Sequence, residues 1–128
     1  MNTVTFYLDP DYGNYSYQNA SNVELCILGL FFSDIGCSKQ SSPTYQEWML
    51  YDKWGTAVGT NATFLEKDGD YIFLTEHFSE EEKSTQLKIF RQQFVQLLNE
   101  WQGKVCKTKP SKVIITHEND EFIIETTD

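Results

Sequence analysis

The sequence predicts a single α+β domain in which helices pack on a mostly antiparallel sheet. Three observations support this fold class: one long amphipathic helical pattern, two hairpin signals, and a composition of 40% hydrophobic and 15% aromatic residues. A chain of 128 residues has the length of one domain and buries on the order of two-thirds of its unfolded surface. No repeat, linker or low-complexity tract divides residues 1–128, so we expect one core.

The strongest helical pattern covers residues 79–102. Ser79 and Glu82 match a capping box at its start. Gly103 matches the residue that follows a helix, and Pro110 would prevent the helix from resuming. An apolar stripe at spacings of three and four residues predicts one buried face, which needs a broad apolar surface such as a sheet. The stripe consists of Leu87, Phe90, Phe94, Leu97, Leu98 and Trp101.

The N-terminal half predicts a strand followed by a second helix. Residues 3–8 alternate between apolar and polar side chains, as in a half-buried strand, and residues 9–14 form a turn cluster. A second capping-box signal opens residues 22–35, which we predict as a helix. A buried strand is the alternative, because this segment has few polar residues. Residues 46–54 are rich in aromatic side chains and fit either a strand or a short helix that leads into a loop.

Two hairpins complete the predicted sheet. Residues 63–66 and 71–75 flank Asp68-Gly69, a strong turn signal. Residues 112–117 and 121–126 flank Asn119-Asp120. Both faces of this second hairpin are partly apolar, so we expect it inside the sheet with the long helix on one side.

The charge indicates which partners the protein attracts. Ten Lys and Arg residues against nineteen Asp and Glu residues give a net charge of −9. This charge would repel nucleic acid and anionic membranes and attract a basic partner. The alternative is that acidity serves only solubility. No apolar run approaches the ~18 residues that span a bilayer, and the N-terminus lacks the pattern of a signal peptide. These features predict a cytoplasmic protein.

The cysteines agree with that expectation. The chain has three cysteines, an odd number: Cys26, Cys37 and Cys106. They show neither a Cys-x-x-Cys motif nor a zinc-ligand spacing. We therefore predict ordinary reduced thiols, with no disulfide framework and no structural zinc.

Catalytic signals are missing. The two histidines, His77 and His117, each lie at the end of a predicted strand, and neither has a nucleophile motif beside it. The glycines form no phosphate-binding loop. Asp9 and Asp11 are spaced like calcium ligands, but Gly13 stands where a third ligand would be needed. The sequence therefore predicts no catalytic residue, no metal, no cofactor and no enzymatic activity.

Acidic and tyrosine residues gather at predicted turns and tips. Each acidic cluster alone is typical of a solvated turn, and the tyrosines alone fit either a half-packed strand or a contact surface. Together they predict an acidic and aromatic face that suits a basic protein partner. The candidate contact residues are Asp9, Asp11, Tyr12, Tyr15, Tyr17, Glu66, Asp68, Asp70, Glu118, Asp120 and Glu121.

In size, acidity, element order and lack of a catalytic motif, the whole chain resembles bacterial immunity proteins, especially those of contact-dependent growth inhibition systems. The resemblance implies that it binds and neutralises a cognate toxin domain, often a basic nuclease, by covering its active site or an essential surface. It carries over no residue roles. A ligand-binding or enzymatic domain that uses His77 or His117 is one alternative, and an acidic phage-type inhibitor is another. The sequence leaves the oligomeric state open.

Overall fold

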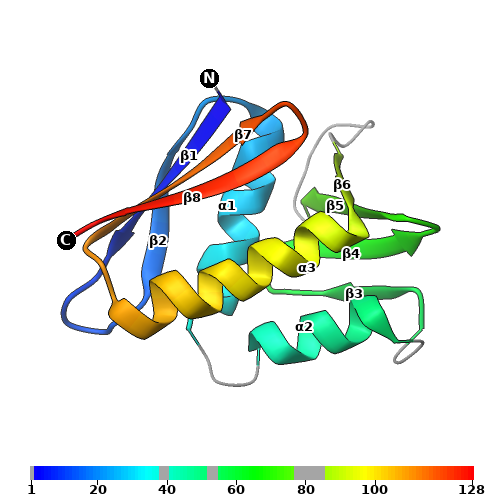
Figure 1. Ribbon diagram of the computed structural model, residues 1–128, viewed down its shortest axis with the longest axis horizontal. Helices are drawn as coiled ribbons and strands as arrows, with labels where there is room; N and C mark the ends of the chain where they lie inside the picture. The colour runs from blue at the N-terminus through cyan, green and yellow to red at the C-terminus, as the bar shows by residue number, and fades with distance from the viewer. Residues whose placement is uncertain (1, 38–40, 52–54, 77–85) are drawn as a thin grey trace.

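The computed structural model describes residues 2–37, 41–51, 55–76 and 86–128 and has two four-stranded antiparallel sheets (Figure 1). In spatial order, the first sheet contains β2 (Tyr15–Ala20), β1 (Asn2–Leu8), β7 (Lys112–Glu118) and β8 (Glu121–Thr127). The second sheet contains β3 (Ala57–Gly59), β4 (Thr63–Asp68), β5 (Tyr71–Glu76) and β6 (Leu87–Phe90). The predicted α+β class is confirmed, with the strands divided between two sheets.

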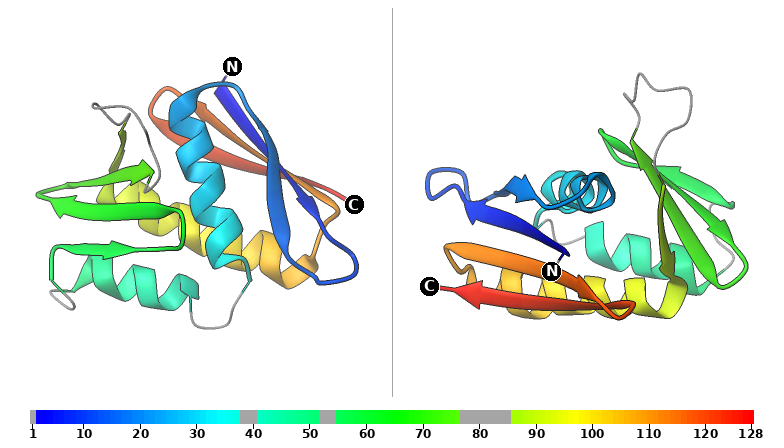
Figure 2. Two further views of the ribbon diagram at one scale, coloured as in Figure 1. Left: turned by 180° about the vertical axis from the view of Figure 1, so that it is seen from behind. Right: turned by 90° about the horizontal axis from the view of Figure 1, so that it is seen from above.

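In the described part of the chain, three helices pack with these two sheets, and two of the three contact both. They are α1 (Val23–Ile35), α2 (Ser41–Leu50) and α3 (Arg91–Glu100), which continues as the π-helical segment η1 (Trp101–Cys106). Both α1 and α3 contact strands of both sheets, and Figure 2 shows α1 between the sheets. None of the described helices is long and apolar enough to cross a bilayer.

An aromatic cluster around Trp101 forms one part of the core. The ring centroid of Trp101 lies 4.5 Å from that of Phe32, 5.2 Å from that of Phe6 and 5.7 Å from that of Tyr15. The indole Nε1 donates a hydrogen bond of 2.8 Å to Gly36 O. Because Phe6 is in β1, Phe32 in α1 and Trp101 in η1, this cluster fixes the long helix against the first sheet.

The long helix is confirmed, but its bounds differ from residues 79–102. Its predicted cap at Ser79 lies outside the described residues. Leu87 and Phe90 belong to β6, where Leu87 pairs with Leu74 and Phe90 with Tyr71 of β5. Pairing with β5 therefore prevails over the local helical spacing. The helix also continues through Gly103 and ends before Lys109, whose φ is 51°. The rest of the stripe is buried as predicted: Phe94, Leu97, Leu98 and Trp101.

The remaining predicted elements agree more closely. Residues 23–35 are a helix rather than a strand, although its cap is Asn22, whose side chain accepts from Leu25 N at 2.9 Å. Residues 46–50 belong to helix α2, which supports the helical alternative there. Both hairpins form. In the second, Asn119 (φ 52°) and Asp120 (φ 63°) have positive φ, as a type I′ turn requires.

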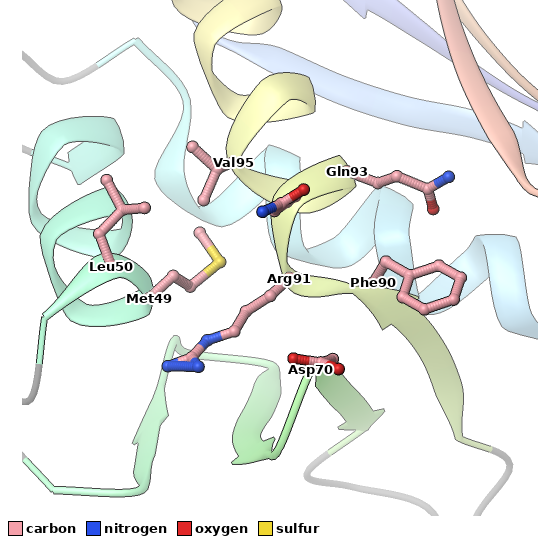
Figure 3. A pocket seen from close by; sticks show the side chains of 8 residues that line it. Met49, Leu50, Asp70, Phe90, Arg91, Gln93 and Val95 are labelled. Atoms are coloured by element: carbon pink, nitrogen blue, oxygen red, sulfur yellow. The ribbon is translucent and has the colours of Figure 1, made fainter.

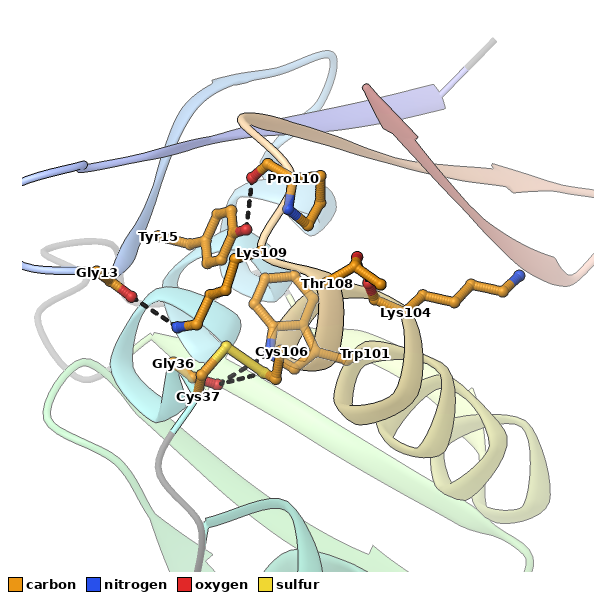
Figure 4. The surroundings of a disulfide bond; sticks show 10 residues. All are labelled: Gly13, Tyr15, Gly36, Cys37, Trp101, Lys104, Cys106, Thr108, Lys109 and Pro110. Atoms are coloured by element: carbon orange, nitrogen blue, oxygen red, sulfur yellow. Dashed lines mark hydrogen bonds between the residues drawn. A yellow bond between two sulfur atoms is a disulfide. The ribbon is translucent and has the colours of Figure 1, made fainter. Parts of the chain in front are cut away.

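Two of the cysteines are oxidised. Cys37 and Cys106 form a disulfide with a Cα–Cα distance of 5.2 Å, so the prediction of reduced thiols is wrong for this pair (Figure 4). Cys26 remains free. The two partners are 69 residues apart in the sequence, and no local spacing reveals that α1 and η1 bring them together. The reduced-thiol argument for a cytoplasmic protein therefore fails.

Candidate functional site

Three adjoining pockets form a groove along α3, which we call the α3 groove. Their volumes are about 580, 270 and 300 Å³. The first and second share Phe90 and Gln93, and the second and third share Gln93 and Phe122. The groove therefore runs from the end of α2, past β6, to the starting end of β8.

The first pocket lies between α2 and the start of α3. Met49 and Leu50 line it from α2, and Asp70 lines it from the β4–β5 turn. Figure 3 shows the Arg91 side chain extending toward Met49, with Asp70 on its other side. Arg91 Nη1 donates to Gly69 O at 3.2 Å, whereas its buried Nε makes no hydrogen bond with the described residues. This pocket combines an apolar wall with groups of both charges.

Two stacked ring pairs line the second pocket. Tyr71 and Phe90 stack with centroids 4.6 Å apart, and His117 and Phe122 stack at 4.3 Å with an interplanar angle of 5°. Lys88 Nζ lies 3.9 Å from the centroid of Tyr71, where a cation–π contact is favourable. The first pair comes from the second sheet and the other from the β7–β8 hairpin. This pocket therefore bridges the two sheets.

The third pocket lies between α3 and β8, the edge strand of the first sheet. Glu100 and Gln96 line it from the helix, and Glu121, Phe122 and Ile123 line it from the strand. No lysine, arginine or histidine is among the described residues that line this pocket. It is therefore the most anionic part of the groove.

The whole groove combines net negative charge with exposed apolar surface. Leu50 is 57% exposed, Ile123 44% and Phe90 42%. Such mixed surfaces are typical of protein interaction sites. Among the described residues, its carboxylates outnumber its cations: Asp70, Glu100, Asp120 and Glu121 against Lys88 and Arg91.

Comparison with protein-family models, with curated proteins and with solved structures finds no match to this chain.

Three of the predicted contact residues line the α3 groove, namely Asp70, Asp120 and Glu121. Glu118 is the last residue of β7, next to the turn that contains Asp120, and it is exposed. Glu66 and Asp68 are exposed residues of β4, on the face of the strand opposite to the buried Thr63 and Leu65. These six residues therefore belong to two hairpins, β4–β5 and β7–β8.

Another three predicted residues lie on the β1–β2 turn, which is close to the end of the long helix in Figure 1. Asp9 Oδ1 accepts hydrogen bonds from Asp11 N at 2.9 Å and from Tyr12 N at 3.4 Å, so Asp9 stabilises its own turn. Tyr12 is 84% exposed. These residues do not line the α3 groove and form a separate acidic tip.

The other two tyrosines are packed in the structure. Tyr15 is 1% exposed, so it offers no contact area to a partner, and its burial raises the pKa of its hydroxyl. Tyr17 is partly buried against Gly29 of α1, and burial, followed by its interactions with Cys26 and Glu76, raises its pKa. Of the two interpretations of these tyrosines, packing of a strand against the core fits both residues better than a role in a contact surface.

Of the two histidines, only His117 is among the residues that the structure describes. His117 lines the second pocket and stacks on Phe122. His77 lies outside the described residues. The described part of the chain also contains no group of three or more His, Cys, Asp or Glu side chains that could hold a metal ion.

Sequence reasoning missed several groove residues. Gln93, Gln96 and Glu100 are polar residues outside the apolar stripe of the long helix, so helical periodicity alone separates them from its buried face. Phe90 and Phe122 are different, because apolar residues in predicted helices and strands are first assigned to the core. Only the tertiary arrangement brings them to one groove.

Proposed function

We propose that the protein is an immunity-type inhibitor that binds a basic toxin domain through the α3 groove. The observation that carries the proposal is that Asp70, Asp120 and Glu121 line three successive pockets of one groove, which also contains the exposed Phe90 and Ile123. Carboxylates steer a basic partner toward the groove, and the exposed apolar side chains slow its dissociation. The overall charge of −9 adds to this attraction.

The experiment that tests this function is co-purification followed by an inhibition assay. The tagged protein is purified from its own host at low salt, and any partner recovered in equal amount is identified and prepared alone. We expect a basic domain that is toxic when expressed without this protein and inactive when bound to it. A recovered partner whose activity the protein leaves unchanged would rule out the inhibitor function.

The compartment in which the inhibitor acts is a separate part of the proposal. The resemblance to immunity proteins favours the cytoplasm, whereas the Cys37–Cys106 disulfide is typical of oxidising compartments. Trapping free thiols in intact cells distinguishes the two. Three reactive thiols per chain indicate the cytoplasm, and a single one, Cys26, indicates an oxidising compartment.

Binding of a small ligand is the second candidate function, and one observation favours it. His117, Lys88 and Asp120 line the same pocket of about 270 Å³, so a small polar molecule would meet groups of both charges there. A ligand in this pocket would change the NMR signals of the His117 ring. Unchanged signals in the presence of host metabolites, together with a recovered protein partner, would exclude this candidate.

A further inference from the structure

The third pocket of the α3 groove is the part best suited to a cation. Glu100 ends α3 and Glu121 begins β8, so two separate elements bring two carboxylates to one pocket of about 300 Å³. This volume corresponds to roughly ten water molecules, which is enough for one long side chain. The pocket is open to solvent at Glu121 and Ile123, both of which are exposed.

We infer that this pocket receives an arginine side chain of the partner protein, an inference that rests on the proposed inhibitor function. The guanidinium group would lie between the carboxylates of Glu100 and Glu121. The aliphatic part of the side chain would lie on Phe122 and Ile123, whose apolar atoms line the same pocket. The pocket thus matches both the charge and the apolar part of this side chain.

Arginine suits the pocket better than lysine does. Its planar guanidinium has five N–H donors, and the pocket offers several acceptors: the carboxylates of Glu100 and Glu121 and the side-chain oxygen of Gln96. Arginine is also more weakly hydrated than lysine and stacks on aromatic rings such as that of Phe122. A lysine ammonium group has three donors and a stronger hydration shell.

The other two pockets do not favour a cation in the same way. Arg91 lines the first pocket and Lys88 the second, and each sets a positive charge against the single carboxylate of that pocket. In the third pocket, none of the described lining residues carries a positive charge that would offset Glu100 and Glu121. The charge along the groove therefore selects the end beside β8 as the cation site.

The test adds N-acetyl-arginine amide as the probe to the intact chain and detects its binding by ¹H–¹⁵N NMR. We expect saturable shifts in residues 96–100 and 121–123, smaller shifts with the lysine amide, and none with the citrulline amide, which has the same shape without the charge. In the variant Glu100→Gln/Glu121→Gln, binding of the arginine probe should weaken by about tenfold, as expected for loss of charge-assisted hydrogen bonds. The control variant Asp11→Asn/Glu66→Gln removes the same charge elsewhere and should bind the probe as the unmodified chain does.

Equal shifts with the arginine and citrulline probes, or shifts confined to other surfaces, would overturn the arginine pocket. So would an unchanged affinity in the Glu100→Gln/Glu121→Gln variant, provided that its spectrum shows a folded chain. These results leave the inhibitor function intact if the recovered toxin domain is still neutralised. If the probe binds as expected and no toxin domain is neutralised, the arginine pocket stands and the inhibitor function fails.

Discussion

Tyr15 places its hydroxyl group in the core, where Pro110 O accepts its hydrogen bond at 2.5 Å (Figure 4). The ring packs against Trp101, so this one residue links β2, η1 and the segment before β7. Burial raises the pKa of Tyr15 above its ordinary value of 10.0. The unfolded chain therefore releases this proton at a lower pH than the folded chain does.

This difference predicts how stability changes at alkaline pH. Below the ordinary pKa of 10.0 the contribution of Tyr15 is fully present, and above it the free energy of unfolding falls as pH rises toward the folded pKa. Tyr15→Phe should lose about 1 kcal/mol at neutral pH, because the hydrogen bond is lost. In this variant the free energy of unfolding should also fall less steeply at alkaline pH, as measured by urea unfolding followed by fluorescence. Tyr12→Phe on the exposed turn is the control, and equal alkaline slopes in both variants would contradict this role for Tyr15.

Gly29 shows a second constraint at the residue scale. A Cβ atom at this position would lie 2.7 Å from Cγ of Tyr17, because α1 packs closely against β2 there. Gly29→Ala should therefore lower the free energy of unfolding by about 1–3 kcal/mol, the usual cost of overpacking. Gly103 is the matched control, since a Cβ there would meet nothing within 4 Å.

The control substitution has its own expected sign. Gly103→Ala lies in an exposed part of η1 and should stabilise the chain by about 0.5–1 kcal/mol, because alanine restricts the unfolded backbone. Chemical denaturation of both variants measures the two effects. If the Gly29→Ala variant were as stable as the Gly103→Ala variant, this result would contradict the close contact between α1 and β2.

At the scale of elements, the disulfide joins the end of α1 to the end of η1. Cross-linking residues 69 apart removes freedom from the unfolded chain, and the chain-entropy relation gives about 4 kcal/mol. Cys37→Ser should therefore lower the midpoint of urea unfolding strongly, and a reducing agent should do the same to the unmodified chain. Cys26→Ser, which removes the free thiol, should have little effect by comparison. Insensitivity of the unmodified chain to reduction would contradict a disulfide that contributes to stability.

Local signals predicted some elements well and others poorly. The turn at Asn119-Asp120 and the helix over residues 23–35 are encoded by a few neighbouring residues, and both were predicted. The boundary between β6 and α3 was not predicted. Leu87 and Phe90 match the helical spacing by chance, and their pairing with β5 involves residues that are distant in the sequence. The disulfide was missed for the same reason, since nothing near Cys37 or Cys106 identifies the other.

At the scale of the whole molecule, α3 is one of the two described helices that contact both sheets, and it also lines the groove. Its buried face packs in the core through Phe94, Leu97 and Leu98, and polar residues beside that face, Gln93, Gln96 and Glu100, line the groove. Periodicity predicted the buried face of this helix but did not identify the groove residues beside it. The carboxylates that meet it come from two hairpins far apart in the sequence, so the sequence predicted three of the acidic groove residues without showing that they share a surface.

The groove also explains why only part of the acidic surface is proposed to bind. The tip that contains Asp9 and Asp11 is acidic but does not line the pockets, and Asp9 is engaged in its own turn. Asp120→Asn/Glu121→Gln removes two charges from the groove, and asparagine tolerates the positive φ of 63° at position 120. Asp11→Asn/Glu66→Gln removes two negative charges outside the groove, so the two variants have the same net charge.

The most direct test of the groove compares these two variants with the unmodified chain in co-purification from the host at low salt, with the recovered partner quantified by mass spectrometry. We predict that the unmodified chain and Asp11→Asn/Glu66→Gln recover the same basic domain in equal amount. Asp120→Asn/Glu121→Gln should recover several-fold less, and high salt should reduce recovery by all three, because exposed charges are screened. Equal recovery by both variants would contradict the assignment of the α3 groove as the binding surface.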